Sequence, residues 1–249
     1  MCWNLPVSVG MAAIGGGASA VARRRGAPTA VWIALAFFAA MEALQAAGYL
    51  VINACGTPAN RAITFLSFLH IAIQPIFINA ISLELIPPEI RNRIRSYVYF
   101  ICGACTVLTL AQLLPLDWAG DCRIPETMCA RTLCTRSGDW HVAWDIPLNG
   151  LGTWIDNFIG ANWGLPFYML AVFVAPIIYG SWRFAIFHLL LGPVFANALT
   201  TQNNEVPAIW CLFSVGIVGL AFFPPMLDWF RVRSWPLWPR GWTGAGVPA

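Results

Sequence analysis

Long runs of hydrophobic residues, separated by short polar turns, dominate the pattern along this chain. The runs cover residues 5–22, 30–53, 61–87, 97–116, 163–180, 184–200 and 206–227. About 20 apolar residues in a helix, each rising about 1.5 Å, are enough to cross the hydrocarbon of a bilayer. The pattern therefore predicts an all-α, polytopic membrane protein with seven transmembrane helices.

The third run, residues 61–87, is long enough to cross a bilayer and yet contains several polar side chains. Ser67, His70, Gln74 and Asn79 all lie within it, and His70 and Gln74 are four residues apart, on one face of a helix. Polar side chains at this depth are costly. We therefore expect them to face a protein interior or a wet cavity rather than lipid.

Four more polar side chains lie in or beside other runs. With those of the third run, they predict a buried polar pocket lined by Glu42, Gln45, Ser67, His70, Gln74, Asn79, Asn197 and Glu205. A buried glutamate is usually neutral or paired, and no arginine lies at the depth of Glu42. We therefore expect Glu42 to be hydrogen-bonded, with His70 as its partner.

This set of residues leaves three roles open. It could form a polar network that fixes helix packing without any ligand. It could bind a ligand or substrate. It could also hold a metal, with His70 as the candidate ligand.

Composition supports the membrane assignment and excludes several kinds of site. Hydrophobic residues make up 59% of the 249 residues and charged residues 10%, against about 25% charged in a soluble domain. The chain contains no lysine, which excludes a lysine Schiff base and a P-loop. The sequence has no long basic run with interleaved aromatic residues, so it gives no indication of a nucleic acid partner. We expect one transmembrane domain over residues 1–230 and a basic tail, rich in proline and tryptophan, over residues 231–249.

The distribution of arginine predicts the orientation. One side of the predicted membrane carries Arg23, Arg24, Arg25, Arg91, Arg93, Arg95, Arg183, Arg231, Arg233 and Arg240. The other side has four arginines and more acidic residues than arginines. Because cytoplasmic loops carry the excess of arginine and lysine, we expect an outside N-terminus, a cytoplasmic C-terminus and a location in the bacterial inner (plasma) membrane.

The longest polar segment, residues 117–162, is predicted to be an external loop rich in tryptophan and tied by disulfides. Five cysteines map to this outer, oxidising side: Cys2, Cys55, Cys122, Cys129 and Cys134. Four of them could form two bridges, and we expect one bridge to join Cys55 to the loop, although spacing alone leaves the pairing open. His141, beside Asp139 and Asp145, is either a metal or acid–base group or a surface histidine.

Several phrases resemble a family of uncharacterised multi-spanning proteins that begin Met-Cys-Trp. They are Met1-Cys2-Trp3-Asn4, Met41-Glu42-Ala43-Leu44-Gln45, Leu69-His70-Ile71-Ala72-Ile73-Gln74-Pro75, Tyr179-Gly180-Ser181-Trp182-Arg183 and Asn204-Glu205-Val206-Pro207. This resemblance implies a seven-helix domain and no established activity. Ser67 and His70 also resemble the serine-plus-histidine helix of the ceramidase and adiponectin-receptor membrane hydrolases, which hold zinc. This chain departs from their late histidine pair, because it has only His188 on the sixth run and no histidine on the seventh.

These patterns favour a protein that binds an apolar or amphipathic ligand, either a small molecule or a lipid, or that is a subunit of a membrane complex with other membrane proteins as partners. One alternative is a metal-dependent hydrolase of lipids that uses Glu42, His70 and Ser67, with zinc as the metal. Another is a haem or pigment protein with His70 or His188 as the axial ligand. Whether the protein is an enzyme stays open at this stage.

Overall fold

The N-terminal half of the molecule consists of four long helices joined by short turns. The computed structural model describes residues 3–160 and 163–242. The helices are α1 (Leu5–Arg24), α2 (Thr29–Leu50), α3 (Pro58–Leu83) and α4 (Pro88–Ala111). Proline stands in the first turn of α1, α3 and α4, where its missing N–H is not needed. The side chains of Asn4 and Thr57 cap the N-termini of α1 and α3.

The C-terminal half is more broken. One helical stretch contains α6 (Pro166–Met169), the π-helical η2 (Leu170–Val174) and α7 (Ala175–Tyr179). A second contains α8 (Trp182–Leu189), the π-helical η3 (Leu190–Val194) and α9 (Phe195–Leu199). The short η4 (Asn203–Glu205) then leads into α10 (Val206–Ala221), and α11 (Pro224–Phe230) follows.

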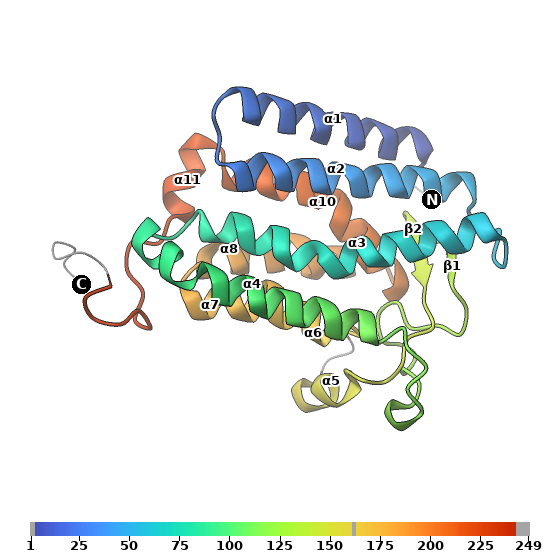
Figure 1. Ribbon diagram of the computed structural model, residues 1–249. Helices are drawn as coiled ribbons and strands as arrows, with labels where there is room; N and C mark the ends of the chain where they lie inside the picture. The colour runs from blue at the N-terminus through green and yellow to red at the C-terminus, as the bar shows by residue number, and fades with distance from the viewer. Residues whose placement is uncertain (1–2, 161–162, 243–249) are drawn as a thin grey trace.

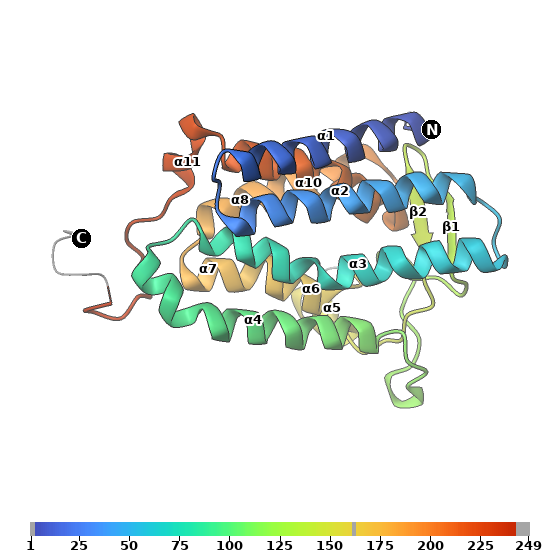
Figure 2. The same cartoon turned by 45° about the horizontal axis from the view of Figure 1, so that its top comes forward.

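The long helices lie side by side along one common direction, and α10 lies behind α2 in the view of Figure 1 (Figures 1 and 2). Of the long apolar helices, α10 buries most of its residues, whereas α1 packs on α2 and buries few. The main hydrophobic core joins α2, α3, α8 and α10, and its large side chains include Phe38, Phe68 and Phe184.

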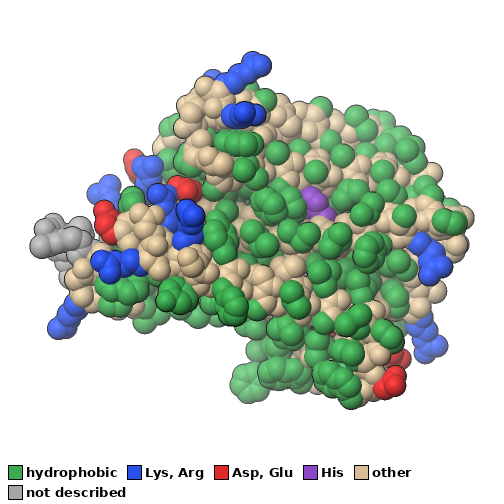
Figure 3. Space-filling model, viewed as in Figure 1, with side chains coloured by type: hydrophobic (Ala, Val, Ile, Leu, Met, Phe, Trp, Pro, Cys, Tyr) green, Lys and Arg blue, Asp and Glu red, His purple; other side chains and the backbone are tan. Residues whose placement is uncertain are grey.

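The expected helical architecture is confirmed, and six helices among the described residues are long and apolar enough to cross a membrane. The fifth apolar run differs from the expected residues 163–180, because its helix covers only Pro166–Tyr179. Gly164 has a left-handed backbone with φ +69° and turns the chain, so the helix begins later, at Pro166. Charged side chains gather toward the two ends of the face drawn in Figure 3, and hydrophobic and uncharged side chains cover its middle.

The loop between α4 and α6 folds onto the helices at the end of the bundle opposite α11 (Figure 1). It contains η1 (Asp117–Ala119), a hairpin of β1 (Cys134–Ser137) and β2 (Val142–Asp145), and α5 (Thr153–Ile159). The strands pair antiparallel with Cys134 opposite Asp145. Val142 and Trp144 of β2 belong to the main core, so the loop is part of the packed structure.

Two disulfides join four of the five cysteines that the sequence places on this side. The bridge between Cys55 and Cys134 ties the turn between α2 and α3 to β1 and confirms the expected link to the loop. The second bridge, between Cys122 and Cys129, closes a short turn within the loop. Cys2 lies outside the described residues.

The tail beyond α11 folds back along the opposite end of the bundle. The indole N–H groups of Trp235 and Trp238 donate to the backbone carbonyls of Ile178 and Tyr179, at 3.0 and 2.9 Å. The guanidinium of Arg93 lies 5.5 Å from the ring centre of Trp242. Residues 231–242 are therefore docked on α4 and α7, and residues 243–249 lie outside the described part of the chain.

Candidate functional site

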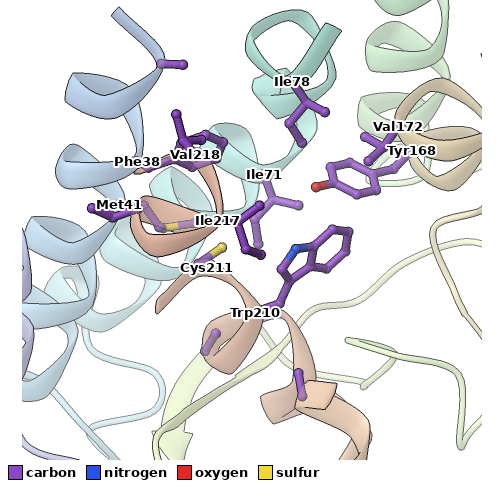
Figure 4. Packing of buried hydrophobic residues seen from close by; sticks show 14 of the residues in the cluster. Phe38, Met41, Ile71, Ile78, Tyr168, Val172, Trp210, Cys211, Ile217 and Val218 are labelled. Carbon is purple, nitrogen blue, oxygen red and sulfur yellow. The ribbon is translucent and has the colours of Figure 1, made fainter. Parts of the chain in front are cut away.

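An open cavity of about 490 Å³ lies between α3, α6, α9, α10 and the loop. Its wall consists of Ile71, Gln74, Thr127, Gly160, Trp163, Leu165, Tyr168, Met169, Pro193, Val194, Asn197, Asn203, Val206, Pro207, Trp210 and Cys211. None of these side chains is acidic, basic or a histidine. Ile71, Tyr168 and Trp210 turn toward one another from α3, α6 and α10, as Figure 4 shows.

A break in the sixth apolar helix shapes one wall of this pocket. Gly192 leaves helical geometry, with φ −92° and ψ −106°, and Pro193 follows it within the π-helical η3. A Cβ at Gly192 would collide with the indole of Trp210, so only glycine lets that ring lie against the helix backbone. The facing helix has its own π-helical turn, η2, and such turns are frequent at functional sites.

Hydrogen bonds fix the polar groups at the deep end of the pocket. The hydroxyl of Tyr168 donates to Gln74 Oε1 at 2.7 Å, and Gln74 Nε2 donates to Cys211 Sγ at 3.3 Å. Trp210 Nε1 donates to His188 Nε2 at 3.0 Å, which holds the indole in place. Gln74, Tyr168 and Cys211 are buried, whereas Asn197 is exposed at the mouth.

Gln74 and Asn197 are the two residues of the predicted polar pocket that line this cavity. Glu42 and Ser67 are fully buried outside its wall, and no described group hydrogen-bonds to either carboxylate oxygen of Glu42 or to the Ser67 hydroxyl. The expected hydrogen bond between Glu42 and His70 is therefore wrong. The imidazole of His70 instead stacks on Phe37, with ring centres 3.7 Å apart, so an aromatic ring from α2 covers one face of the imidazole.

His70 reaches the surface of the bundle instead of its interior. Among the three histidines, it alone is partly exposed, and Figure 3 shows histidine surface surrounded by hydrophobic side chains. Its Nε2 atom is shielded and has no hydrogen-bond partner among the described residues. Within the described part of the chain, no three histidine, cysteine or acidic side chains come together as a metal site would require.

Gln45 belongs to a network that joins α2 to the loop. Its amide N–H donates to the carbonyl of Ala208 at 3.1 Å, and its amide oxygen is hydrogen-bonded to His141 Nε2. Because an amide oxygen only accepts, Nε2 carries the proton, and the Tyr49 hydroxyl donates to Nδ1 at 2.6 Å. His141 is fully buried, so it is not a surface histidine, and both of its ring nitrogens are hydrogen-bonded, to Gln45 and Tyr49. Burial lowers the pKa of His141 to about 4.

Glu205 also serves the loop and does not line the cavity. Its carboxylate is fully buried and accepts hydrogen bonds from three successive backbone N–H groups, those of Asp139, Trp140 and His141. The hydroxyl of Thr200 donates to the same carboxylate. A Cβ at Gly138 would collide with it, so the carboxylate lies directly against the loop backbone. The sequence places Glu205 at the N-terminal end of α10, where it lies, but the expected place in the ligand pocket is wrong.

Asn79 links three helical segments and is fully used by the protein itself. Its Nδ2 donates to the carbonyls of Pro75 and Ala171, both at 2.9 Å, and its Oδ1 accepts from the Tyr179 hydroxyl at 2.9 Å. Pro75 lacks an N–H, and the side chains of Asn79 and Thr106 donate to the carbonyls of Pro75 and Ala72 in this part of α3.

Sequence reasoning did not select Tyr168, Trp210 or Cys211, although they form the pocket. Each lies in a run that contains many other apolar and aromatic residues, so nothing in the sequence distinguishes it from its neighbours. The available signal was the Gly192-Pro193 pair inside the sixth run, because that dipeptide interrupts a helix and makes room beside it.

Comparisons with known proteins identify the family to which the chain belongs. No curated protein and no solved structure matches the chain. The sequence profile of one family matches residues 6–231, which begin within α1 and extend through the loop to α11. The chain therefore belongs to DUF5765, a family of unknown function.

Proposed function

We propose that this protein is an integral membrane protein of seven spans whose pocket binds a neutral apolar or amphipathic molecule. The wall of the pocket is the observation that carries this proposal. It is aromatic and aliphatic, it has no charged side chain, and its few polar groups are uncharged amides, hydroxyls and a thiol. Ligand pockets commonly combine such an apolar wall with a few convergent polar groups.

The surface of the bundle supports embedding in a bilayer. Six helices have the length and composition of membrane spans, and α4 exposes apolar residues such as Phe100 and Val107. We assign the seventh crossing to Pro166–Tyr179, which at about 1.5 Å per residue spans roughly 20 Å and requires local thinning of the bilayer. The arginine-rich end with the tail is the cytoplasmic end, and the hairpin end is outside, in the bacterial inner membrane.

The polar groups define the chemistry of the ligand. A thiol is a weak acceptor, so the Gln74 amide can turn from Cys211 to a carbonyl or hydroxyl of a ligand. The side chain of Asn197 makes no hydrogen bond within the described residues, which leaves it available at the mouth. A charged group would find no opposite charge on this wall and would lose its hydration without compensation. The ligand that fits is a neutral lipid with a small hydrogen-bonding head.

The enzymatic and cofactor alternatives have weaker support. Glu42, Ser67 and His70 lie outside the pocket wall, and no described group joins them by a hydrogen bond to a catalytic partner. The Nε2 lone pair of His188 is occupied by the indole N–H of Trp210, so this nitrogen is not free to bind a metal.

Extraction of bound lipid from the purified protein tests the proposal. The protein is purified in detergent, extracted with organic solvent, and the extract is compared by mass spectrometry with that of Val194→Trp. Val194 lines the mouth, and a tryptophan there should close it. Val107→Trp is the matched control, because Val107 is 65% exposed on α4 and outside the pocket wall.

We expect one neutral lipid species to copurify with the wild type and with Val107→Trp and to be lost from Val194→Trp. Absence of any enriched species from the wild type would contradict ligand binding. Equal retention by Val194→Trp would place the bound lipid elsewhere on the molecule.

A further inference from the structure

Helix α5 is amphipathic, with its polar side turned toward the protein. Asp156 is buried and accepts from the backbone N–H of Gly164 at 2.8 Å. The side chain of Asn157 accepts from the guanidinium of Arg123, and Thr153 donates to Glu126. Thus all three polar side chains of α5 hydrogen-bond to other parts of the protein, and Asp156 does so from a buried position.

The other side of α5 is apolar and open. Trp154 is 67% exposed, Phe158 88% and Ile159 56%, and Trp154 and Phe158 are four residues apart on one face. Ile124, next to the Arg123 that binds α5, is also exposed. We call Ile124, Trp154, Phe158 and Ile159 the α5 ridge. Large apolar residues this exposed and this close together mark an interaction surface.

The position of α5 indicates what covers the ridge. In Figures 1 and 2, α5 lies alongside the bundle, at the level of the C-terminal half of α4 and of α6, and does not extend beyond the end of the bundle. That half of α4 exposes Val107 and Leu108, and the turn that follows the helix exposes Leu114, so the apolar surface continues from α4 at the level of the ridge. Figure 3 shows this part of the molecule covered mostly by hydrophobic side chains.

We propose that the α5 ridge inserts into the outer leaflet of the bilayer and places the mouth of the pocket at the edge of that leaflet. Gly160, which ends α5, and Trp163 both line the pocket. Val194 and Asn197, on the opposite side of the mouth, are also exposed. The pocket therefore takes its neutral lipid sideways from the outer leaflet, and this part of the inference rests on the proposed function. Amphipathic helices at interfaces bind lipid through such apolar faces.

Photocrosslinking to lipid tests the position of the ridge. The variant Phe158→p-benzoylphenylalanine, of similar shape to the natural residue, is placed in phosphatidylcholine nanodiscs, irradiated and weighed intact by mass spectrometry. The control is Ala59→p-benzoylphenylalanine. Ala59 is exposed in the first turn of α3. That end of α3 lies at the end of the bundle that carries the hairpin, beyond the level of α5 (Figure 1).

We expect the adduct of protein with one phosphatidylcholine to be several-fold more abundant at position 158 than at position 59. Equal or lower yield at position 158 would overturn insertion of the ridge, even if lipid extraction still showed an occupied pocket. A high yield at position 158 with an empty pocket in the extraction experiment would leave the ridge in the leaflet and reject the proposed ligand site.

Discussion

Replacing Glu205 with alanine should release the hairpin loop from the helices. The carboxylate accepts from the backbone N–H groups of Asp139, Trp140 and His141 and from the Thr200 hydroxyl, and it is fully buried. A buried donor left without an acceptor costs about 1–3 kcal/mol. Three backbone donors without an acceptor should therefore lower the free energy of unfolding by about 3–6 kcal/mol. This range assumes that water enters the space and satisfies the donors in part.

The isosteric change Glu205→Gln separates the charge from the shape. It keeps one acceptor oxygen but turns an NH₂ group toward donors that need an acceptor, so it should be intermediate in effect. Asp121→Ala is the control, because it removes an exposed acid from the same loop and should change stability by less than about 0.5 kcal/mol.

Amide hydrogen exchange of residues 138–142, followed by mass spectrometry in detergent, measures the release directly. A local loss of about 3 kcal/mol corresponds to exchange roughly 100-fold faster at these amides, with thermal unfolding shifted in the same direction. If Glu205→Ala exchanged like Asp121→Ala at these positions, the carboxylate would not be what holds the loop.

Three further predictions concern the loop and the pocket. Burial lowers the pKa of His141 to about 4, below its ordinary value of about 6.5, so the stability due to neutral His141 is fully present above about pH 6.5 and is lost, by up to about 3 kcal/mol, as the pH falls toward 4. The wild type should therefore lose thermal stability faster on acidification than His141→Gln. Parallel curves of unfolding temperature against pH would refute this. Removing the Cys55–Cys134 bridge by double alanine substitution should destabilise the protein by roughly 4 kcal/mol, and removing the Cys122–Cys129 bridge by roughly 2 kcal/mol. The first bridge joins cysteines 79 residues apart and the second cysteines 7 residues apart, so the first closes a much longer loop in the unfolded chain. Equal shifts in unfolding temperature would contradict that reasoning. Gly192→Ala should displace the indole of Trp210 and lower the amount of copurifying lipid, and unchanged retention would show that the ring is not part of the site.

The sequence by itself determined the helices and the side of the molecule on which the cysteines lie. A membrane span must satisfy its backbone hydrogen bonds within one segment, so each span is a continuous apolar run whose limits proline, glycine and capping residues mark locally. The limits were less accurate. The helix of the fifth run is shorter because Gly164 and Pro166 moved its start, the helix of the seventh run ends at Ala221, and the helix of the fourth run begins earlier, at Pro88. The link from Cys55 to the loop was expected from the sequence and is confirmed, whereas spacing alone left its partner in the loop open.

Only the tertiary structure decided what each buried polar residue does. Glu205 is 64 residues from the backbone N–H of His141, and Gln74 is 137 residues from Cys211, so no local pattern relates these partners. Gln45, Asn79 and Glu205 looked like ligand-binding residues because their polarity at depth was visible, while their partners were not. The pocket arises where a broken helix leaves space beside Trp210. Helices depend on hydrogen bonds between residues four apart, whereas a pocket depends on how distant segments pack, which is why the sequence predicted the helices and not the pocket.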